Sequence, residues 1–232
     1  MIALQAQGVW KYYGDYPALR DLNFTVDTGS CLALLGRNGA GKTTLLRILA
    51  GLSKPTRGRA TLFGQEVREQ GTRRRIGVLG HGIGVYDELS AFENLCLFGR
   101  LYGVQDPQKE AIEWLRRVGL DRVKDGLVRE FSRGMRQRLA VARAFLHSPS
   151  VLFLDEPFTA LDDRAVTILQ DLLQDARSEG RTIIISTHQL PEALRLATHV
   201  LLINQGRLAF CGQRTSEMVD NPGVLYRLFA EA

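Results

Sequence analysis

The feature of this chain that most restricts its fold is the stretch LALLGRNGAGKTTLLR, at residues 32–47. It begins as an apolar run, passes through a loop that fits G-x-x-x-x-G-K-[ST], and continues with helical spacing. Because glycine tolerates positive φ, such a loop can wrap around phosphate groups with its N–H groups pointing inward. The pattern therefore predicts an α/β core in which a strand, a loop and a helix together hold a nucleoside triphosphate.

The residue types in this loop match the chemistry of a triphosphate and its Mg²⁺. Lys42 is expected to reach the β- and γ-phosphates, and the hydroxyl of Thr43 is expected to bind Mg²⁺. A helix that begins near Lys42 adds the positive end of its dipole. The residues expected to contact the nucleotide here are Gly36, Arg37, Asn38, Gly39, Ala40, Gly41, Lys42, Thr43 and Thr44.

Composition favours a globular protein of a reducing compartment. Of the 232 residues 45% are hydrophobic, which suits one large α/β domain or a core with an insert. No stretch approaches the roughly 18 apolar residues of a membrane-spanning helix, and the N-terminus lacks the basic and apolar regions of a signal peptide. The three cysteines are widely spaced and lack metal-ligand spacing, so a cytosolic location is expected.

The net charge of +5 is compatible with a nucleic-acid partner or with an anionic membrane surface. The arginines are, however, spread over many segments, and the densest run is only Arg73-Arg74-Arg75. A run of this length is usually a solvated face. Charge alone therefore selects neither partner.

Hydrophobic periodicity changes along the chain. Near the N-terminus two strand-like segments, LQAQGVW and LRDLNFTVD, flank a turn-rich YYGDYP, and a strand pair (RATLFG, EVRE) follows the loop and its helix. Helical spacing dominates residues 83–148, where Asp106 and Pro107 are expected to begin one helix. Residues 1–82 and 149–232 are expected to form the core with an N-terminal antiparallel β subdomain.

Beyond Pro149 the strand pattern returns as near-continuous apolar runs, which are typical of strands buried on both faces of a parallel sheet. Helices are expected between these runs, at about 163–179 and 190–197. The strands are expected at VLFLD (151–155), TIIIST (182–187) and HVLLINQG (199–206). The predicted fold is thus a P-loop NTPase (RecA-like) core with a mainly parallel sheet, interrupted by a helical insert.

The apolar segment VLFLDE (151–156) ends in two acids. An Asp at the carboxyl end of such a strand can hold Mg²⁺, often through water, which is the role expected of Asp155. Glu156 is then placed to orient or deprotonate the attacking water. The strand TIIIST is the expected sheet neighbour of VLFLD, so His188, which follows it, is expected to lie near the γ-phosphate.

With these motifs in this order, the chain resembles the ATP-binding subunit of an ABC transporter over nearly its whole length. The resemblance implies that Tyr13 stacks on adenine, that ALD (160–162) is the D-loop and that His188 is the switch histidine. FSRGMRQR (131–138) stands where the signature motif belongs. Taken alone, Ser132 would be an ordinary helix N-cap. The resemblance instead implies that Ser132 and Gly134 contact the nucleotide of the other subunit in a head-to-tail dimer.

Two motifs depart from the family pattern. The usual signature LSGGQ is FSRGM here, which keeps the serine and the second glycine but replaces the final amide by Met135. The glutamine that normally follows the strand IGVLG is replaced by His81, and imidazole is a poor Mg²⁺ ligand beside oxygen donors. His81 is expected to act through water or to alter the coupling. The same LGH run resembles the ATPase of haem exporters in cytochrome c maturation.

The resemblance implies an ATPase, with ATP and Mg²⁺, that drives an exporter at the cytoplasmic face of the cell membrane. Its implied partners are transmembrane subunits and a second ATPase subunit, in a homodimer or a heterodimer. The expected cargo is haem, and the alternative is a drug, polysaccharide or ion. An ABC ATPase that acts on nucleic acid is a rival, but such proteins usually carry two cassettes or a long coiled coil, so no nucleic acid is expected. A regulatory cassette without turnover is disfavoured because Lys42, Asp155, Glu156 and His188 are all present.

Overall fold

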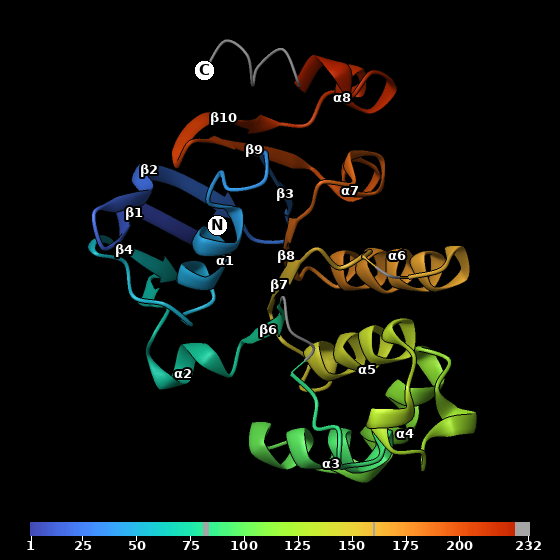
Figure 1. The fold of residues 1–232 in the computed structure, drawn as a ribbon. Helices are drawn as coiled ribbons and strands as arrows, with labels where there is room; N and C mark the ends of the chain where they lie inside the picture. Colours follow the sequence, from blue (N-terminus) through green and yellow to red (C-terminus); the bar gives the residue numbers. More distant parts are fainter. Residues whose placement is uncertain (81–83, 160, 226–232) are drawn as a thin grey trace.

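A computed structural model describes residues 1–80, 84–159 and 161–225, within which the chain forms two sheets. The first is an antiparallel sheet with strand order β2-β1-β4-β5 (Figure 1). Its strands are β1 (Ile2–Tyr13), β2 (Tyr16–Asp27), β4 (Arg57–Leu62) and β5 (Gln65–Glu66). It forms the N-terminal part of the molecule.

The second sheet has the strand order β10-β9-β3-β8-β7-β6. All its neighbouring strands are parallel except β10, which pairs with β9 in the antiparallel sense. Its strands are β3 (Cys31–Leu35), β6 (Ile76–Leu79), β7 (Val151–Asp155), β8 (Thr182–Ser186), β9 (His199–Asn204) and β10 (Arg207–Gln213). The residues of β3, β7 and β8 are all buried, as expected for strands covered on both faces.

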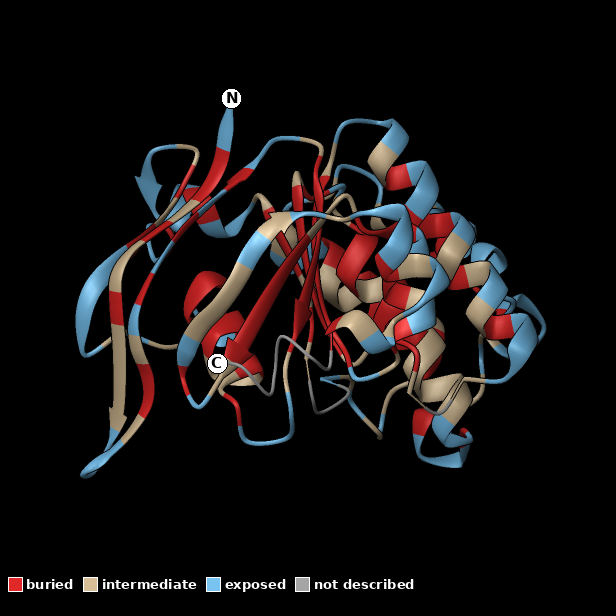
Figure 2. Cartoon of the chain, turned by 90° about the horizontal axis from the view of Figure 1, so that it is seen from above, coloured by how far each residue is buried: buried red, intermediate tan, exposed pale blue. Residues whose placement is uncertain are grey.

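Helix α1 (Lys42–Leu49) lies between the two sheets. Leu45, Leu46, Ile48 and Leu49 are almost fully buried in a hydrophobic cluster that also contains side chains from β1, β2, β3 and β9. Figure 2 shows this concentration of buried residues on the strands and the inner helices, with exposed residues at the rim. The start of α1 is therefore fixed by packing on both sides.

Most of the remaining helices lie on the other side of the second sheet, whereas α2 (Gln70–Arg73) lies on the same side as the antiparallel sheet (Figure 1). A large hydrophobic cluster joins the helical segment to the sheet through Leu139, Phe145 and Leu154. Helix α5 therefore packs on the sheet as well as on α3 and α4. The helices are α2 (Gln70–Arg73), α3 (Ala91–Tyr102), α4 (Pro107–Arg117), α5 (Arg133–Phe145), α6 (Asp163–Ser178), α7 (Leu190–Leu196) and α8 (Ser216–Asp220), with short 3₁₀ turns at Asp121–Val123 and Val128–Glu130.

The predicted fold class is confirmed, and most elements lie close to their predicted positions. The parallel strands, α6 and α7 match within two residues, and Asp106 caps α4 by accepting a hydrogen bond from the N–H of Lys109 at 3.1 Å. The turn expected in YYGDYP is present, but it is confined to Gly14-Asp15, and the rest of that segment extends β1 and β2. Strand β10 and helix α2 were not predicted. Strand β10 lies at the edge of the sheet, and all its residues are exposed or only partly buried.

Candidate active site

The phosphate loop connects β3 to α1 and is held in shape by its glycines. Gly41 has φ 109° and immediately precedes the helix. A Cβ at Gly41 would lie 2.7 Å from the carbonyl oxygen of Ala18, so no larger residue fits there without a shift of the backbone. The ammonium of Lys42 donates to the carbonyl oxygens of Gly36, at 2.9 Å, and of Arg37, at 3.2 Å. Two carbonyl groups of the loop therefore hold the ammonium of Lys42 in place.

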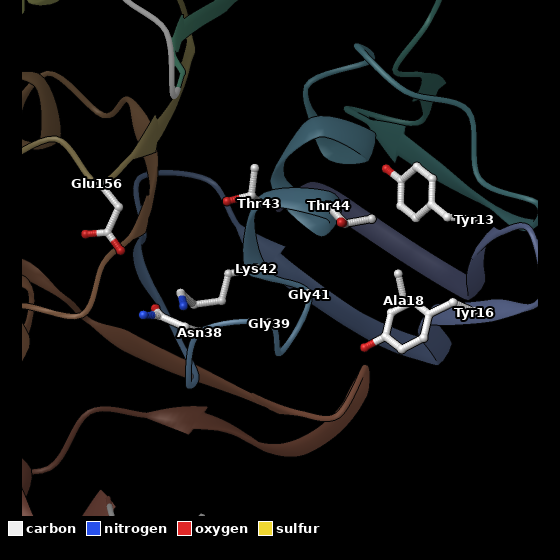
Figure 3. A pocket seen from close by; sticks show the side chains of 10 residues that line it. All are labelled: Tyr13, Tyr16, Ala18, Asn38, Gly39, Gly41, Lys42, Thr43, Thr44 and Glu156. Atoms are coloured by element: carbon white, nitrogen blue, oxygen red, sulfur yellow. The ribbon is translucent and has the colours of Figure 1, made fainter.

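A cavity of about 340 Å³ lies beside this loop. Figure 3 shows the residues that line it. Glu156 stands on one side of Lys42, and Tyr13 and Tyr16 stand on the other. The cavity is lined by Tyr13, Tyr16, Ala18, Asn38, Gly39, Gly41, Lys42, Thr43, Thr44 and Glu156. A polar end and an aromatic end in one cavity of this size suit a molecule with a phosphate chain and a base.

The structure thus brings most of the predicted loop residues and Glu156 into one cavity. Tyr13 is about half exposed, so its ring face is available for stacking. Sequence reasoning missed Tyr16, which is the last aromatic of YYGDYP and lies across the turn from Tyr13. The signal in the sequence was an aromatic residue two positions after Gly14, because such a residue lies opposite Tyr13 when the chain turns there.

Lys42 is buried next to two carboxylates. Burial lowers the pKa of Lys42, while the negative charges of Glu156 and Asp155 oppose this shift. An ammonium that is largely removed from water interacts strongly with phosphate oxygens, because the surrounding dielectric constant is low. Lys42 is therefore suited to stabilise charge on a transferred phosphoryl group.

Glu156 directly follows β7 and has a strained backbone, with φ 52°. A non-glycine residue in this region costs about 1–2 kcal/mol, and such residues gather at functional sites. Its Oε2 accepts hydrogen bonds from Thr187 Oγ1, at 3.1 Å, and from the N–H of His188, at 3.4 Å. His188 Nδ1 lies 2.8 Å from the same oxygen. These contacts fix the carboxylate at the edge of the cavity.

Thr187 is a second residue that sequence reasoning missed. It is buried, and its hydroxyl bonds Glu156 while accepting a hydrogen bond from the N–H of Gln189 at 3.0 Å. The parallel pairing of β7 with β8 places Asp155 opposite Ser186, which explains why the residues after both strands meet. The acids at the end of one strand do not by themselves indicate that Thr187, which follows β8, is their partner.

Within the described chain, unpartnered buried oxygens lie at the ends of β7 and β8, where Mg²⁺ is expected. Asp155 is buried, and its Oδ1 has no hydrogen-bond partner among the described residues, as is also true of the hydroxyl of its neighbour Ser186. Such an orphaned carboxylate oxygen beside the phosphate loop fits a bound cation or its water. The described part of the chain contains no cluster of three His, Cys, Asp or Glu side chains able to hold a metal. Thr43 and Asp155 would therefore share the ion with phosphate oxygens and water.

Ser132 and Gly134 do not line the cavity. Ser132 is the N-cap of α5, and its Oγ accepts a hydrogen bond from the N–H of Met135 at 3.2 Å. This is the geometry expected of an ordinary cap, and it leaves the hydroxyl proton free to donate elsewhere. His81 and the first residue of ALD, Ala160, lie outside the described residues. Within the described parts of the chain, no helix has the length and apolar character needed to cross a bilayer.

Comparison with known proteins identifies relatives along most of the chain. A family model described as "ABC transporter" matches residues 19–159, and one described as "AAA domain, putative AbiEii toxin, Type IV TA system" matches residues 124–195. Nod factor export ATP-binding protein I of Cupriavidus metallidurans is 38% identical over 222 residues, which are 94% of this chain and 73% of that protein. ABC transporter ATP-binding protein NatA of Bacillus subtilis is 40% identical over 200 residues, which are 84% of this chain and 81% of NatA.

Solved structures agree with these relatives. One ATP-binding subunit of an ABC transporter superposes with a TM-score of 0.88 at 29% identity and covers 99% of this chain and 98% of its own. An ATP-binding cassette in a dimeric post-hydrolysis state with ADP and Pi shares the fold, with a TM-score of 0.81 at 24% identity over 92% of this chain and 99% of its own. The chain therefore belongs to the ABC transporter family and is an ATPase, the ATP-binding subunit of such a transporter.

Proposed function

We propose that two copies of this chain enclose ATP between them and hydrolyse it to drive an exporter with separate membrane subunits. The observation that carries this proposal is Glu156, a strained and hydrogen-bonded carboxylate facing Lys42 across a cavity of nucleotide size. In this proposal Tyr13 and Tyr16 contact the adenine. The loop residues Gly36–Thr44 contact the phosphates.

The reaction is an in-line displacement at the γ-phosphorus. Glu156 accepts a hydrogen bond from the attacking water and takes its proton as the new P–O bond forms. The bond from phosphorus to the β–γ bridging oxygen breaks, which gives ADP and inorganic phosphate. Thr187 and His188 hold the carboxylate of Glu156 in place, and Lys42 stabilises the charge on the phosphoryl oxygens. Bound Mg²⁺, held by Thr43 and Asp155, would neutralise further phosphate charge.

The site of one chain is incomplete in this proposal. Ser132 and Gly134 begin α5 away from the cavity of their own chain, although the free hydroxyl proton and the N-terminus of α5 suit a phosphate. A head-to-tail dimer would place them over the γ-phosphate in the partner's cavity. The dimeric state of the cassette that shares this fold supports a dimer here.

The exporter assignment and the cargo are also proposals. Relatives named for Nod factor export support an exporter, in which this chain would dock peripherally on membrane subunits at the cytoplasmic face. For the cargo we propose haem, supported by the run Leu79-Gly80-His81 alone. The relatives cited above are named for Nod factor export and as NatA, and neither name refers to haem. Cytochrome c assembly genes beside this gene would support haem, and unrelated permease genes would contradict it.

The assignment of the base is tested with Glu156→Gln. We expect this variant to bind ATP and to accumulate as a dimer, because the amide keeps the size of the side chain but cannot take a proton. The rate of ATP hydrolysis should fall by at least about a hundredfold, the usual contribution of a general base. Binding of a fluorescent ATP analogue, size-exclusion chromatography and phosphate release measure the three quantities.

The matched control is Glu217→Gln on the exposed surface of α8, which should behave like the wild type. Turnover of Glu156→Gln near that of the wild type would show that another group activates the water. Failure of the wild type to hydrolyse ATP in the presence of Mg²⁺ would contradict the proposed function as a whole.

A further inference from the structure

Arg143 joins three parts of the chain that are distant in sequence. It lies in the last turn of α5, and its Nη2 donates to the carbonyl oxygen of Val78, in β6, at 3.1 Å. Its Nη1 donates to the carbonyl oxygen of Gly84. The guanidinium also lies 5.0 Å from the ring centre of Phe98, in α3. One side chain of α5 therefore holds the chain on both sides of the segment that follows β6.

The contact of α5 with β6 is close and well defined. A Cβ at Gly77 would lie 2.2 Å from the carbonyl oxygen of Ala144, so the two backbones nearly touch. His147 Nε2 lies 3.0 Å from the carbonyl oxygen of Ile76. Helix α5 and β6 thus form one packed unit. Gly84, by contrast, is joined to this unit through the guanidinium of Arg143.

The guanidinium of Arg143 packs directly against Gly84. Gly84 has φ +40°, and a Cβ there would lie 2.4 Å from Nη1 and 3.1 Å from Cζ of Arg143. The fit leaves no room for a larger residue beside Arg143. The geometry at Gly84 and the side chain at position 143 are therefore mutually dependent.

The buried charge of Arg143 lowers the stability of the folded chain. Among the described residues it has carbonyl and ring contacts but no ion pair, and its Nε is buried without a hydrogen-bond partner. Burial lowers the pKa of Arg143, although a guanidinium remains charged at neutral pH. A buried cation without a carboxylate reduces stability relative to a well-packed apolar residue. Its presence indicates a role beyond filling space.

We propose that Arg143 is a positioning residue that makes α5 and Gly84 move as one body, and so couples ATP binding to the α5 N-terminus. This inference rests on the proposed function, since Ser132 and Gly134 begin the same helix. Strand β6, which Arg143 also holds, is paired with β7, at the end of which Asp155 and Glu156 lie. Changes at the nucleotide would thus reach α5 through β7, β6 and Arg143.

Arg143→Lys tests the proposal, because lysine keeps the charge but cannot donate to both carbonyl oxygens. We expect kcat for ATP to fall about tenfold, within the usual range of coupling effects, while the Kd for ATP changes less than about twofold. Arg177→Lys is the matched control. Arg177 is a partly buried arginine of α6 that donates to the carbonyl oxygen of Leu196 at 2.9 Å, and its variant should keep the wild-type kcat.

Gly84→Ala perturbs the same contact from the other side and completes a double-mutant cycle. Gly84→Ala alone should lower kcat about as much as Arg143→Lys does. In the double variant kcat should fall by less than about a further twofold relative to Arg143→Lys, because the contact is already lost. Additive losses, or an equal loss in Arg177→Lys, would show that Arg143 is merely structural and overturn the proposal. An inactive wild type would contradict the proposed function instead. Thermal unfolding midpoints confirm that each variant is folded.

Discussion

At the scale of single residues, the site depends on positions where the backbone takes unusual conformations. Gly39 and Gly41 have φ of 81° and 109° in the phosphate loop, and Glu156 has φ of 52° after β7. The positive φ of Gly41 is readily predicted, because it is a fixed glycine of G-x-x-x-x-G-K-[ST], and Gly39 is a further glycine at a variable position of the same loop. The strain at Glu156 was not predictable, because glutamate occurs in all backbone conformations and only its environment selects this one.

The two loop glycines should respond differently to alanine. A Cβ at Gly39 meets nothing within 4 Å, so Gly39→Ala should cost only the positive φ, about 1 kcal/mol in the free energy of unfolding. A Cβ at Gly41 would collide with Ala18 O and Leu19 Cδ2, so Gly41→Ala should cost about 3 kcal/mol. Urea unfolding without nucleotide measures both. Equal losses would contradict the packing seen at Gly41.

At the scale of elements, α5 connects the parts of the molecule. Its apolar spacing predicts a helix, and Ser132 at its start predicts an N-cap, and both are present. The polar contacts of Arg143, in the last turn of α5, with Val78 and Gly84, and of His147, just after the helix, with Ile76 were not predictable. Periodicity predicts which face of a helix is buried, but it does not indicate which carbonyl groups a long polar side chain will reach.

His147 should make stability depend on pH. Its ring is stacked on Tyr102 with centres 3.9 Å apart, and Nδ1 is buried without a partner among the described residues. Burial lowers the pKa of His147, and the charges of Arg143 and Arg181 lower it further, against the hydrogen bond to Ile76. Below the ordinary histidine pKa of about 6.5 the unfolded chain therefore takes up a proton that the folded imidazole does not.

The free energy of unfolding should accordingly fall as the pH decreases from about 6.5 towards the lower pKa of the folded imidazole. In His147→Gln, which keeps an N–H donor but does not titrate, this part of the decrease should be absent. Guanidinium unfolding of both proteins between neutral and mildly acid pH makes the comparison. Parallel curves for the two proteins would assign the acid sensitivity to other groups.

At the scale of the whole molecule, the arrangement of layers separates the two halves of the proposed site. Helix α1 and the phosphate loop lie between the sheets, whereas α3, α4 and α5 lie on the far side of the second sheet (Figure 1). Ser132 and the cavity are consequently apart within one chain. The proposed function therefore requires a second copy.

Turnover should rise more steeply than linearly with protein concentration when membrane subunits are absent, because the active species is a dimer. A second experiment on the paired site mixes two variants, Lys42→Ala and Ser132→Arg, each of which should be inactive alone. In a mixed dimer one site combines an intact Lys42 with an intact Ser132, so mixing should restore part of the ATPase activity. Each variant alone is the control. A strictly linear concentration dependence, together with no recovery on mixing, would contradict the paired site.

The sequence by itself determined the strand–loop–helix that binds phosphate, the two acids at the end of β7 and the family, because each is a local pattern whose chemistry requires fixed spacing. Only the tertiary structure decided that Tyr16 faces the cavity, that Thr187 holds Glu156 and that Arg143 joins α5 to Val78 and Gly84. These contacts arise from strand order and packing between residues far apart in the chain. No local spacing records them, since they depend on which elements become neighbours.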